Sequence, residues 1–146
     1  MKLRDVMVRD VEVINADASL ADAARAMKKR GIGMLPVFNG DRLVGVVTDR
    51  DLLVRGLSER RNVDETRVQD VMTAQVHACG EDEEADKAVN VLEQQKIWQV
   101  VVLDRQKKLV GIAAVDDLIE RRALPHDHLA RLTHNIHFRG THSLVA

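Results

Sequence analysis

The sequence predicts an α+β protein in which one small β-α-β-β-α unit occurs twice in tandem. The first observation behind this prediction is an internal repeat: the Asp-Val-Met of residues 5–7 returns at residues 70–72, 65 residues later. The Leu-Val-Gly of residues 43–45 returns at residues 109–111, 66 residues later. Two copies are too few for a solenoid array. The second observation is hydrophobic spacing that gives the same element order in both copies.

The first copy begins with a short strand and an amphipathic helix. Val11, Val13 and Ile14 indicate the strand. Ser19 opens a Ser-x-x-Asp pattern, which is typical of a capping box at a helix start, and Gly31 can end this helix in a left-handed conformation. Between them the apolar residues follow the i, i+3, i+4, i+7 spacing of a helix with one buried face: Leu20, Ala23, Ala24 and Met27.

Two more strands and a second helix complete the copy. Residues 34–38 and 43–48 are mostly apolar and flank Asn39-Gly40, a strong signal for a hairpin turn. The second helix begins near Thr48 and runs to about Leu57. The second copy repeats the spacing of the first helix at Ala85, Ala88, Val89 and Leu92.

These elements give a domain organisation. We expect the first motif at residues 1–57, a charged linker at 58–68 and the second motif at 69–123. Residues 124–146 form a His-rich tail, expected to be a short helix or flexible.

Composition narrows the functional class. The 146 residues carry a net charge of −1 and only 2% aromatic residues. This balance lacks the basic surface and the stacking residues of a nucleic-acid-binding protein. No apolar stretch approaches the roughly 18 residues of a membrane span, and a single cysteine, Cys79, is typical of a reducing compartment. We therefore expect a cytoplasmic protein with no nucleic-acid or membrane partner.

Residues 45–51, Gly-Val-Val-Thr-Asp-Arg-Asp, resemble the G-h-x-T-x-x-D signature of CBS (cystathionine beta-synthase) domains, where h is apolar. The resemblance covers roughly residues 1–123 and includes the Asp-Val-Met before each copy. It implies a stand-alone, bacterial-type tandem pair of CBS motifs packed as one pseudo-two-fold module. It also implies an adenosine ligand, either AMP, ADP, ATP or S-adenosylmethionine, together with a homodimer and an unknown effector protein that reads the bound state.

The start of the second helix in the first copy carries the expected ligand residues. Free amides and the Thr48 hydroxyl suit a phosphate, to which Arg50 adds charge and planar donors. Asp51 offers two acceptor oxygens for a ribose diol, and Ile32 can cover one face of a base. The resemblance places Trp98 near the same cleft. The expected ligand-binding set is Thr48, Asp51, Arg50, Asp49, Ile32, Val8 and Trp98.

A structural interpretation of the same residues stays open. Thr48-x-x-Asp51 is also a capping-box pattern, which would stabilise the helix by about 1 kcal/mol. Capping and ligand binding can coexist because both use the free amides at the helix start. By residue type alone, Ile32 and Trp98 are more typical of a core than of a pocket.

The second copy departs from the signature at two positions. Ala114 stands where the first copy has Thr48, and Asp116 replaces Arg50. Two neighbouring carboxylates repel phosphate, so this second, weaker site should be empty or take an uncharged nucleoside or S-adenosylmethionine. The expectation is one nucleotide per chain. The residues of the weaker site are Asp117, Asp116, Ile97 and Thr73.

The histidines of the tail are candidate ligands for a metal ion. Five of the six histidines lie in it: His126, His128, His134, His137 and His142. Their spacing matches no familiar zinc pattern, and Leu129, Leu132 and Ile136 favour a short amphipathic helix instead. We therefore expect no metal site, with a metal-responsive module as an alternative that chelators would reveal.

Catalytic patterns are missing from the sequence. It has no nucleophile elbow, Walker A loop or His-Glu-x-x-His, and His77 near Cys79 lacks a third orienting residue. We expect a regulatory module, not an enzyme, that needs no obligatory cofactor and takes AMP, ADP or ATP as a regulatory ligand. The alternatives are a non-binding dimerisation scaffold with vestigial clefts and an S-adenosylmethionine binder.

Overall fold

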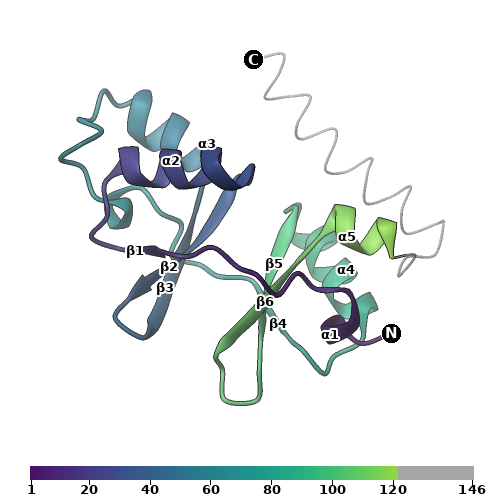
Figure 1. The fold of residues 1–146 in the computed structure, drawn as a ribbon. Helices are drawn as coiled ribbons and strands as arrows, with labels where there is room; N and C mark the ends of the chain where they lie inside the picture. The colour runs from purple at the N-terminus through teal and green to yellow at the C-terminus, as the bar shows by residue number, and fades with distance from the viewer. Residues whose placement is uncertain (122–146) are drawn as a thin grey trace, which may run out of the picture. The chain divides into compact units, whose positions relative to one another are not determined.

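The computed structural model describes residues 1–121, which form two compact units (Figure 1). The first is Glu12–Val76, which we call the Asp51 unit. The second, which we call the Asp117 unit, combines Met1–Val11 with residues 77–121. Each unit contains one three-stranded sheet.

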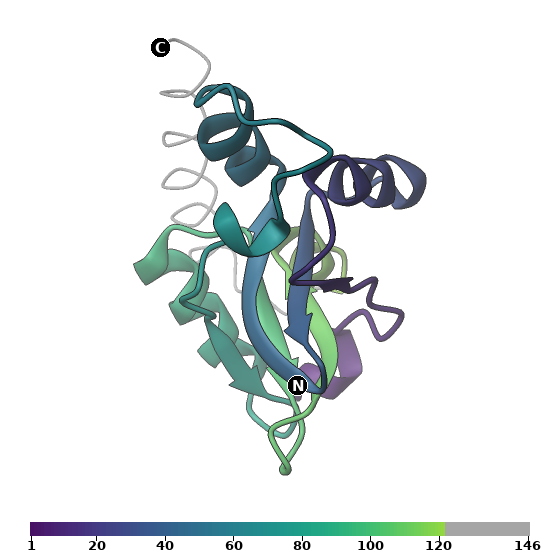
Figure 2. The ribbon, with the colours of Figure 1, turned by 90° about the vertical axis from the view of Figure 1, so that its left-hand side faces the viewer.

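The sheet of the Asp51 unit has the order β1-β2-β3, with β1 parallel to β2 and β2 antiparallel to β3. Helix α2 and the helical segment η1 lie side by side in this unit (Figures 1 and 2). The elements are β1 (Ile14–Asn15), α2 (Leu20–Arg30), β2 (Met34–Asn39), β3 (Arg42–Thr48), α3 (Asp49–Asp51), the π-helical η1 (Leu52–Leu57) and a 3-10 turn, η2 (Val68–Asp70).

The Asp117 unit repeats this topology in the order β4-β5-β6. The matching glycines hold the same register, with Gly45 opposite Val37 and Gly111 opposite Val102. The predicted α+β class and the tandem β-α-β-β-α order are confirmed. The elements are α1 (Leu3–Val6), β4 (Ala78–Gly80), α4 (Ala85–Gln95), β5 (Gln99–Leu103), β6 (Leu109–Ala114) and α5 (Val115–Glu120).

Local chemistry accounts for the ends of α2. The Ser19 hydroxyl accepts the Asp22 N–H at 3.0 Å, and the Asp22 carboxylate accepts the Ser19 N–H at 3.3 Å. This is the predicted capping box. Gly31 ends the helix with a φ of 64°, in the left-handed region that glycine adopts without strain. Both predictions for this helix are confirmed.

Two elements differ in detail from the prediction. Strand β1 starts at Ile14, and Val13 before it is exposed, so the expected strand from Val11 is shorter and shifted. The second helix occupies residues 49–57 as expected, but it widens after Asp51: the Ser58 N–H donates to the Leu53 carbonyl, five residues back. Apolar spacing does not distinguish this wider turn from an α-helix.

The opening segment of the chain belongs to the core of the Asp117 unit. Leu3 and Val6 in α1 are buried in one hydrophobic cluster with Leu92 of α4 and Leu118 of α5. Figure 1 shows α1 beside α4 in this unit. The first Asp-Val-Met therefore precedes the first repeat in the sequence and packs with the second.

The second Asp-Val-Met behaves in the reciprocal way. Val68 and Val71 are buried in the core of the Asp51 unit, together with Leu35 and Val47. Residues just before them also bind this unit, because the Thr66 carbonyl accepts the Leu20 N–H at 3.2 Å. Each compact unit is therefore completed by the segment that opens the other copy.

Across residues 1–121, no helix combines the length and the apolar character that a membrane crossing requires. The expected His-rich tail at residues 124–146, with its histidines and its proposed short helix, lies outside the described residues.

Candidate functional site

The candidate site in the Asp51 unit is built where β3 passes into α3. Thr48 is the N-cap: its hydroxyl accepts the Asp51 N–H at 3.0 Å, and the Asp51 carboxylate accepts the Thr48 N–H at 3.0 Å. The structural interpretation of this pair as a capping box is thus correct. Asp51 is a charged residue that is only 7% exposed. A carboxylate in such a position needs partners to offset its desolvation.

Those partners come from the next turn of the same helix and from the segment around Thr73. The Thr73 hydroxyl lies 3.3 Å from each oxygen of Asp51, and the Arg55 guanidinium lies 3.6 Å from one of them. Thr73 forms an antiparallel bridge with Val46 of β3. The carboxylate therefore sits among a helix cap, a hydroxyl and a cation.

The remaining expected residues of this unit lie around the same helix start. Arg50 and Asp49 are exposed, and Ile32 is 36% exposed. Backbone contact joins the Ile32 loop to the helix, since the Asp49 N–H donates to the Gly33 carbonyl at 3.0 Å. A Cβ at Gly33 would lie 2.9 Å from an Asp49 carboxylate oxygen, which belongs to an exposed side chain that can rotate away. The sequence analysis missed Gly33, for which no motif gives a signal.

The Asp117 unit has the same backbone and different side chains. The Ala114 N–H donates to the Asp117 carboxylate at 3.2 Å, which keeps half of the capping box, because alanine has no hydroxyl to return the bond. The Val115 N–H donates to the Trp98 carbonyl at 3.0 Å, so Trp98 occupies the place that Gly33 has in the Asp51 unit. Trp98 is 49% exposed and Ile97 packs against the core. Its half-exposed ring shows that Trp98 is not a core residue.

Two expected site residues pack in a different unit from the one in which the sequence analysis placed them. Thr73 was expected with Asp117, yet its hydroxyl contacts Asp51. Val8 was expected with Asp51, yet it bridges to Ile112 within the Asp117 unit. The cause is the exchange of opening segments, which carries residues 68–76 into the Asp51 unit and residues 1–11 into the Asp117 unit. Trp98, expected near Asp51, also belongs to the Asp117 unit.

The glycine of each signature makes room for the exchanged segment. A Cβ at Gly45 would lie 2.6 Å from the Thr73 carbonyl oxygen, and one at Gly111 would lie 3.0 Å from the Val8 carbonyl oxygen. Both distances are shorter than ordinary van der Waals contact. The first residue of the signature is therefore explained by packing of the backbone.

The electrostatics of Asp117 differ from those of an ordinary surface carboxylate. Burial raises the pKa of Asp117, and the neighbouring charges of Asp116 and Glu120 raise it further, against the Ala114 hydrogen bond and Arg121, which lower it. The folded unit thus disfavours the ionised form of this side chain.

This pKa direction predicts the effect of Asp117→Asn. A raised pKa in the folded state means that the stability contributed by Asp117 is fully present below pH 3.8 and is lost as pH rises through the folded pKa. Asparagine keeps an acceptor for the Ala114 N–H and removes the charge. We expect a larger free energy of unfolding for Asp117→Asn at pH 7, with the gain shrinking toward pH 3, in urea titrations at both pH values. A variant less stable than wild type at pH 7 would contradict this electrostatic account.

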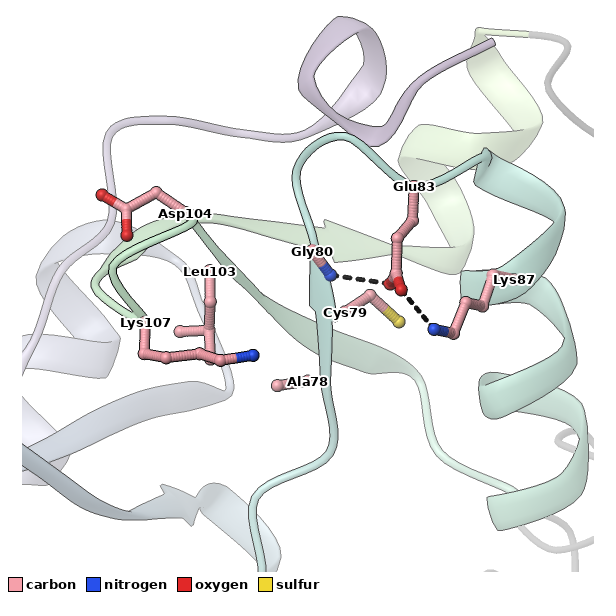
Figure 3. A pocket seen from close by; sticks show the side chains of 8 residues that line it. All are labelled: Ala78, Cys79, Gly80, Glu83, Lys87, Leu103, Asp104 and Lys107. Atoms are coloured by element: carbon pink, nitrogen blue, oxygen red, sulfur yellow. Dashed lines mark hydrogen bonds and ion pairs between the residues drawn. The ribbon is translucent and has the colours of Figure 1, made fainter.

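A separate small pocket of about 200 Å³ lies in the Asp117 unit (Figure 3). Glu83 accepts the Gly80 N–H at 2.7 Å and pairs with Lys87. Cys79 is buried beside them, and burial raises the pKa of its thiol, so the reactive thiolate is disfavoured. The Glu83 carboxylate thus has its hydrogen-bond and charge partners within the pocket wall. The lining residues are Ala78, Cys79, Gly80, Glu83, Lys87, Leu103, Asp104 and Lys107.

Among residues 1–121, no three histidine, cysteine or acidic side chains are arranged to hold a metal ion. The histidines of the tail lie outside this range, so the metal-responsive alternative is not addressed by the described part of the chain.

Comparison with known proteins gives a consistent result. The family model described as CBS domain matches residues 3–57 and 68–124. Inosine-5'-monophosphate dehydrogenase of Methanocaldococcus jannaschii is 30% identical over 125 residues, which are 85% of this chain and 24% of that protein. The chain therefore spans about a quarter of that enzyme. The uncharacterized protein YlbB of Bacillus subtilis is 31% identical over 119 residues, 80% of this chain and 79% of YlbB.

A solved structure adds a bound ligand to the comparison. The crystal structure of CBSX2 in complex with AMP is 25% identical to this chain, with a TM-score of 0.72. The alignment covers 83% of this chain and 95% of CBSX2.

Proposed function

The chain belongs to the CBS domain family, and we propose that it is a regulatory module that binds an adenosine compound of the AMP, ADP and ATP class in its Asp51 unit. The matched CBS regions account for most of the chain, and CBSX2, a relative of similar fold, was crystallised with AMP. These comparisons support an adenosine ligand as the regulatory signal.

The observation that carries the choice of site is the contrast between the two units. Where the Asp51 unit presents the Thr48 hydroxyl and the exposed Arg50, the Asp117 unit presents a methyl group and the exposed Asp116. Placing a phosphate near Arg50 gains a charge-assisted hydrogen bond, whereas placing it near Asp116 brings together two negative charges. The proposal is therefore one nucleotide per chain.

The residues of the Asp51 unit have distinct proposed roles. The Asp51 carboxylate accepts hydrogen bonds from the 2′ and 3′ hydroxyls of the ribose. The Thr48 hydroxyl, whose oxygen accepts the Asp51 N–H, still has its own hydrogen to donate to a phosphate oxygen. Arg50 neutralises the phosphate and Ile32 covers one face of the base. Asp49 orients the helix start, because its carboxylate accepts the Arg50 N–H at 2.9 Å.

A binding module of this kind acts by changing the stability of one state relative to another. The nucleotide can shift the equilibrium only by its differential affinity for the two states. We propose that a homodimer presents these states to an effector protein, and that the chain itself catalyses no reaction.

A thermal-shift panel of AMP, ADP, ATP, S-adenosylmethionine and GTP on the full chain tests the proposal. A ligand at 100 times its Kd stabilises a folded protein by about 2.7 kcal/mol, which is several degrees in Tm for a chain of this size. We expect a shift with at least one adenine nucleotide and none with GTP. A folded protein that shifts with none of the five compounds would refute the binding function.

Arg50 gives a prediction within the same assay. Arg50→Ala removes an exposed cation without touching the core, so the Tm of the free protein should change by less than about 1 °C. The shift caused by the preferred nucleotide should fall by at least half, while the shift caused by adenosine is unchanged. Arg42→Ala, which removes another exposed arginine at the far end of β3, is the matched control. Equal losses in the two variants would show that only net charge matters.

A second candidate function, a non-binding dimerisation scaffold, is favoured by the apolar surface of η1. Leu53, Val54 and Leu57 are 57%, 42% and 65% exposed. A second copy of the chain could cover this face, since exposed apolar side chains gathered on one helix are typical of an interaction surface. A stable dimer that shows no ligand-induced Tm shift would favour the scaffold.

A further inference from the structure

The Asp51 carboxylate is held from three directions. One oxygen accepts the Thr48 N–H at 3.0 Å, the Thr73 hydroxyl approaches both oxygens at 3.3 Å, and an Arg55 nitrogen lies 3.6 Å from the other oxygen. The Thr73 contact is longer than the usual 2.5–3.0 Å of an O–H···O bond. The contact is shared between the two oxygens and leaves acceptor capacity for another donor, because a carboxylate has about four lone-pair sites.

Arg55 joins this carboxylate to the segment that carries Thr73. One guanidinium nitrogen donates to the carbonyls of Val71 and Met72, at 2.9 Å each, while the other faces Asp51. The planar fork of arginine allows both contacts at once. One guanidinium thus links the Asp51 side chain to the backbone next to Thr73.

The Asp117 unit provides an internal comparison. Val8 makes the same two backbone bonds to Ile112, at 2.8 and 3.0 Å, that Thr73 makes to Val46, at 2.8 and 2.9 Å. Valine has no hydroxyl, so Asp117 lacks the donor that Asp51 receives from Thr73. The backbone arrangement is shared, and the orienting hydroxyl is particular to the Asp51 unit.

We propose that Thr73 and Arg55 are positioning residues that aim the Asp51 carboxylate at the ribose diol of the ligand. The inference rests on the proposed function and extends it, because neither residue needs to touch the nucleotide. Its consequence is selectivity: a correctly aimed carboxylate distinguishes a ribose from a 2′-deoxyribose, whereas a misdirected one does not.

The experiment measures the Kd of AMP and of 2′-deoxyadenosine 5′-monophosphate by isothermal titration calorimetry on full-length variants. Wild type is expected to prefer AMP by at least about 10-fold, the value of one hydrogen bond to a charged group. In Thr73→Val the preference should fall below about 3-fold by the same reasoning, and Arg55→Lys, which keeps the charge but lacks the fork, should follow it. Thr73→Ser restores the hydroxyl and should restore the preference. Thr66→Val, outside the site, is the matched control.

The possible outcomes distinguish failure of the proposed function from failure of the positioning role of Thr73 and Arg55. Absence of binding by AMP, ADP and ATP alike in wild type overturns the proposed function, and this inference with it; if ADP or ATP is the nucleotide bound, the same comparison uses its 2′-deoxy form. Binding in wild type with an unchanged AMP preference in both Thr73→Val and Arg55→Lys overturns the inference alone. A purely structural role would weaken both nucleotides by the same factor and leave their ratio intact. Thr73→Val should fold, because Val8 occupies the equivalent position in the Asp117 unit.

Discussion

Gly45→Ala is expected to lower the free energy of unfolding by about 3 kcal/mol, the upper range for an overpacked site. The new methyl group would lie 2.6 Å from the Thr73 carbonyl oxygen, a backbone atom that cannot rotate away. The clash would push residues 72–74 off β3 and strain the bridge between Val46 and Thr73. Urea unfolding followed by circular dichroism measures the loss, and hydrogen exchange of peptides covering β3 locates it.

Two other glycines make this prediction specific. A Cβ at Gly80 meets its nearest neighbour, a Glu83 side-chain atom, at 3.5 Å, so Gly80→Ala should change stability by less than about 1 kcal/mol. At Gly111 the closest atoms belong to the flexible Met7 side chain, and Gly111→Ala should fall between the two. If Gly45→Ala is no more destabilising than Gly80→Ala, the packing explanation of the signature glycine is wrong.

Asp51→Asn is expected to weaken AMP binding by about 100-fold, since two hydrogen bonds from the ribose diol to a charged acceptor are reduced to weaker ones. The asparagine carbonyl can still accept the Thr48 N–H, so the helix cap is retained. The equivalent change Asp117→Asn should alter the AMP Kd by less than about 2-fold, because the account places no nucleotide in that unit. Calorimetric titration of both variants gives the comparison.

Two other results of these titrations would contradict the proposed role of Asp51. Equal loss of affinity in Asp51→Asn and Asp117→Asn would mean that both units take part in binding. Unchanged affinity in Asp51→Asn, with the variant folded, would leave Asp51 as a capping residue only.

Local signals in the sequence predicted the secondary structure. Ser19 and Gly31 mark the ends of α2 because capping and left-handed backbone depend on residues within a turn of the helix end. The periodic apolar residues of α2 and α4 depend equally on near neighbours. For these elements the chain needs no tertiary information.

The exchange of opening segments could not be predicted in the same way. The Asp-Val-Met segments precede their own repeats, and their apolar side chains fit either core. Which sheet they cover depends on backbone pairing, such as Val8 with Ile112, between residues about one hundred positions apart. Grouping residues by repeat therefore placed Val8 with Asp51 and Thr73 with Asp117, whereas the backbone pairs Val8 with Ile112 and Thr73 with Val46.

The groups that contact Asp51 from outside its capping box could not be predicted for a related reason. In the sequence, Arg55 does not differ from the other charged residues expected on the exposed face of a helix. Its hydrogen bonds go to backbone carbonyls sixteen and seventeen residues away. Backbone carbonyls carry no sequence signature. The signature itself identified Thr48 and Asp51 because their mutual contact spans only three residues.

The central claim is that one adenine nucleotide binds per chain, in the Asp51 unit. The most direct test is the stoichiometry of AMP binding to the wild-type protein, measured by isothermal titration calorimetry at protein concentrations above the Kd. One AMP per chain is the expected result. Two molecules of AMP per chain, or a single molecule whose binding survives Asp51→Asn and disappears in Asp117→Asn, would contradict it.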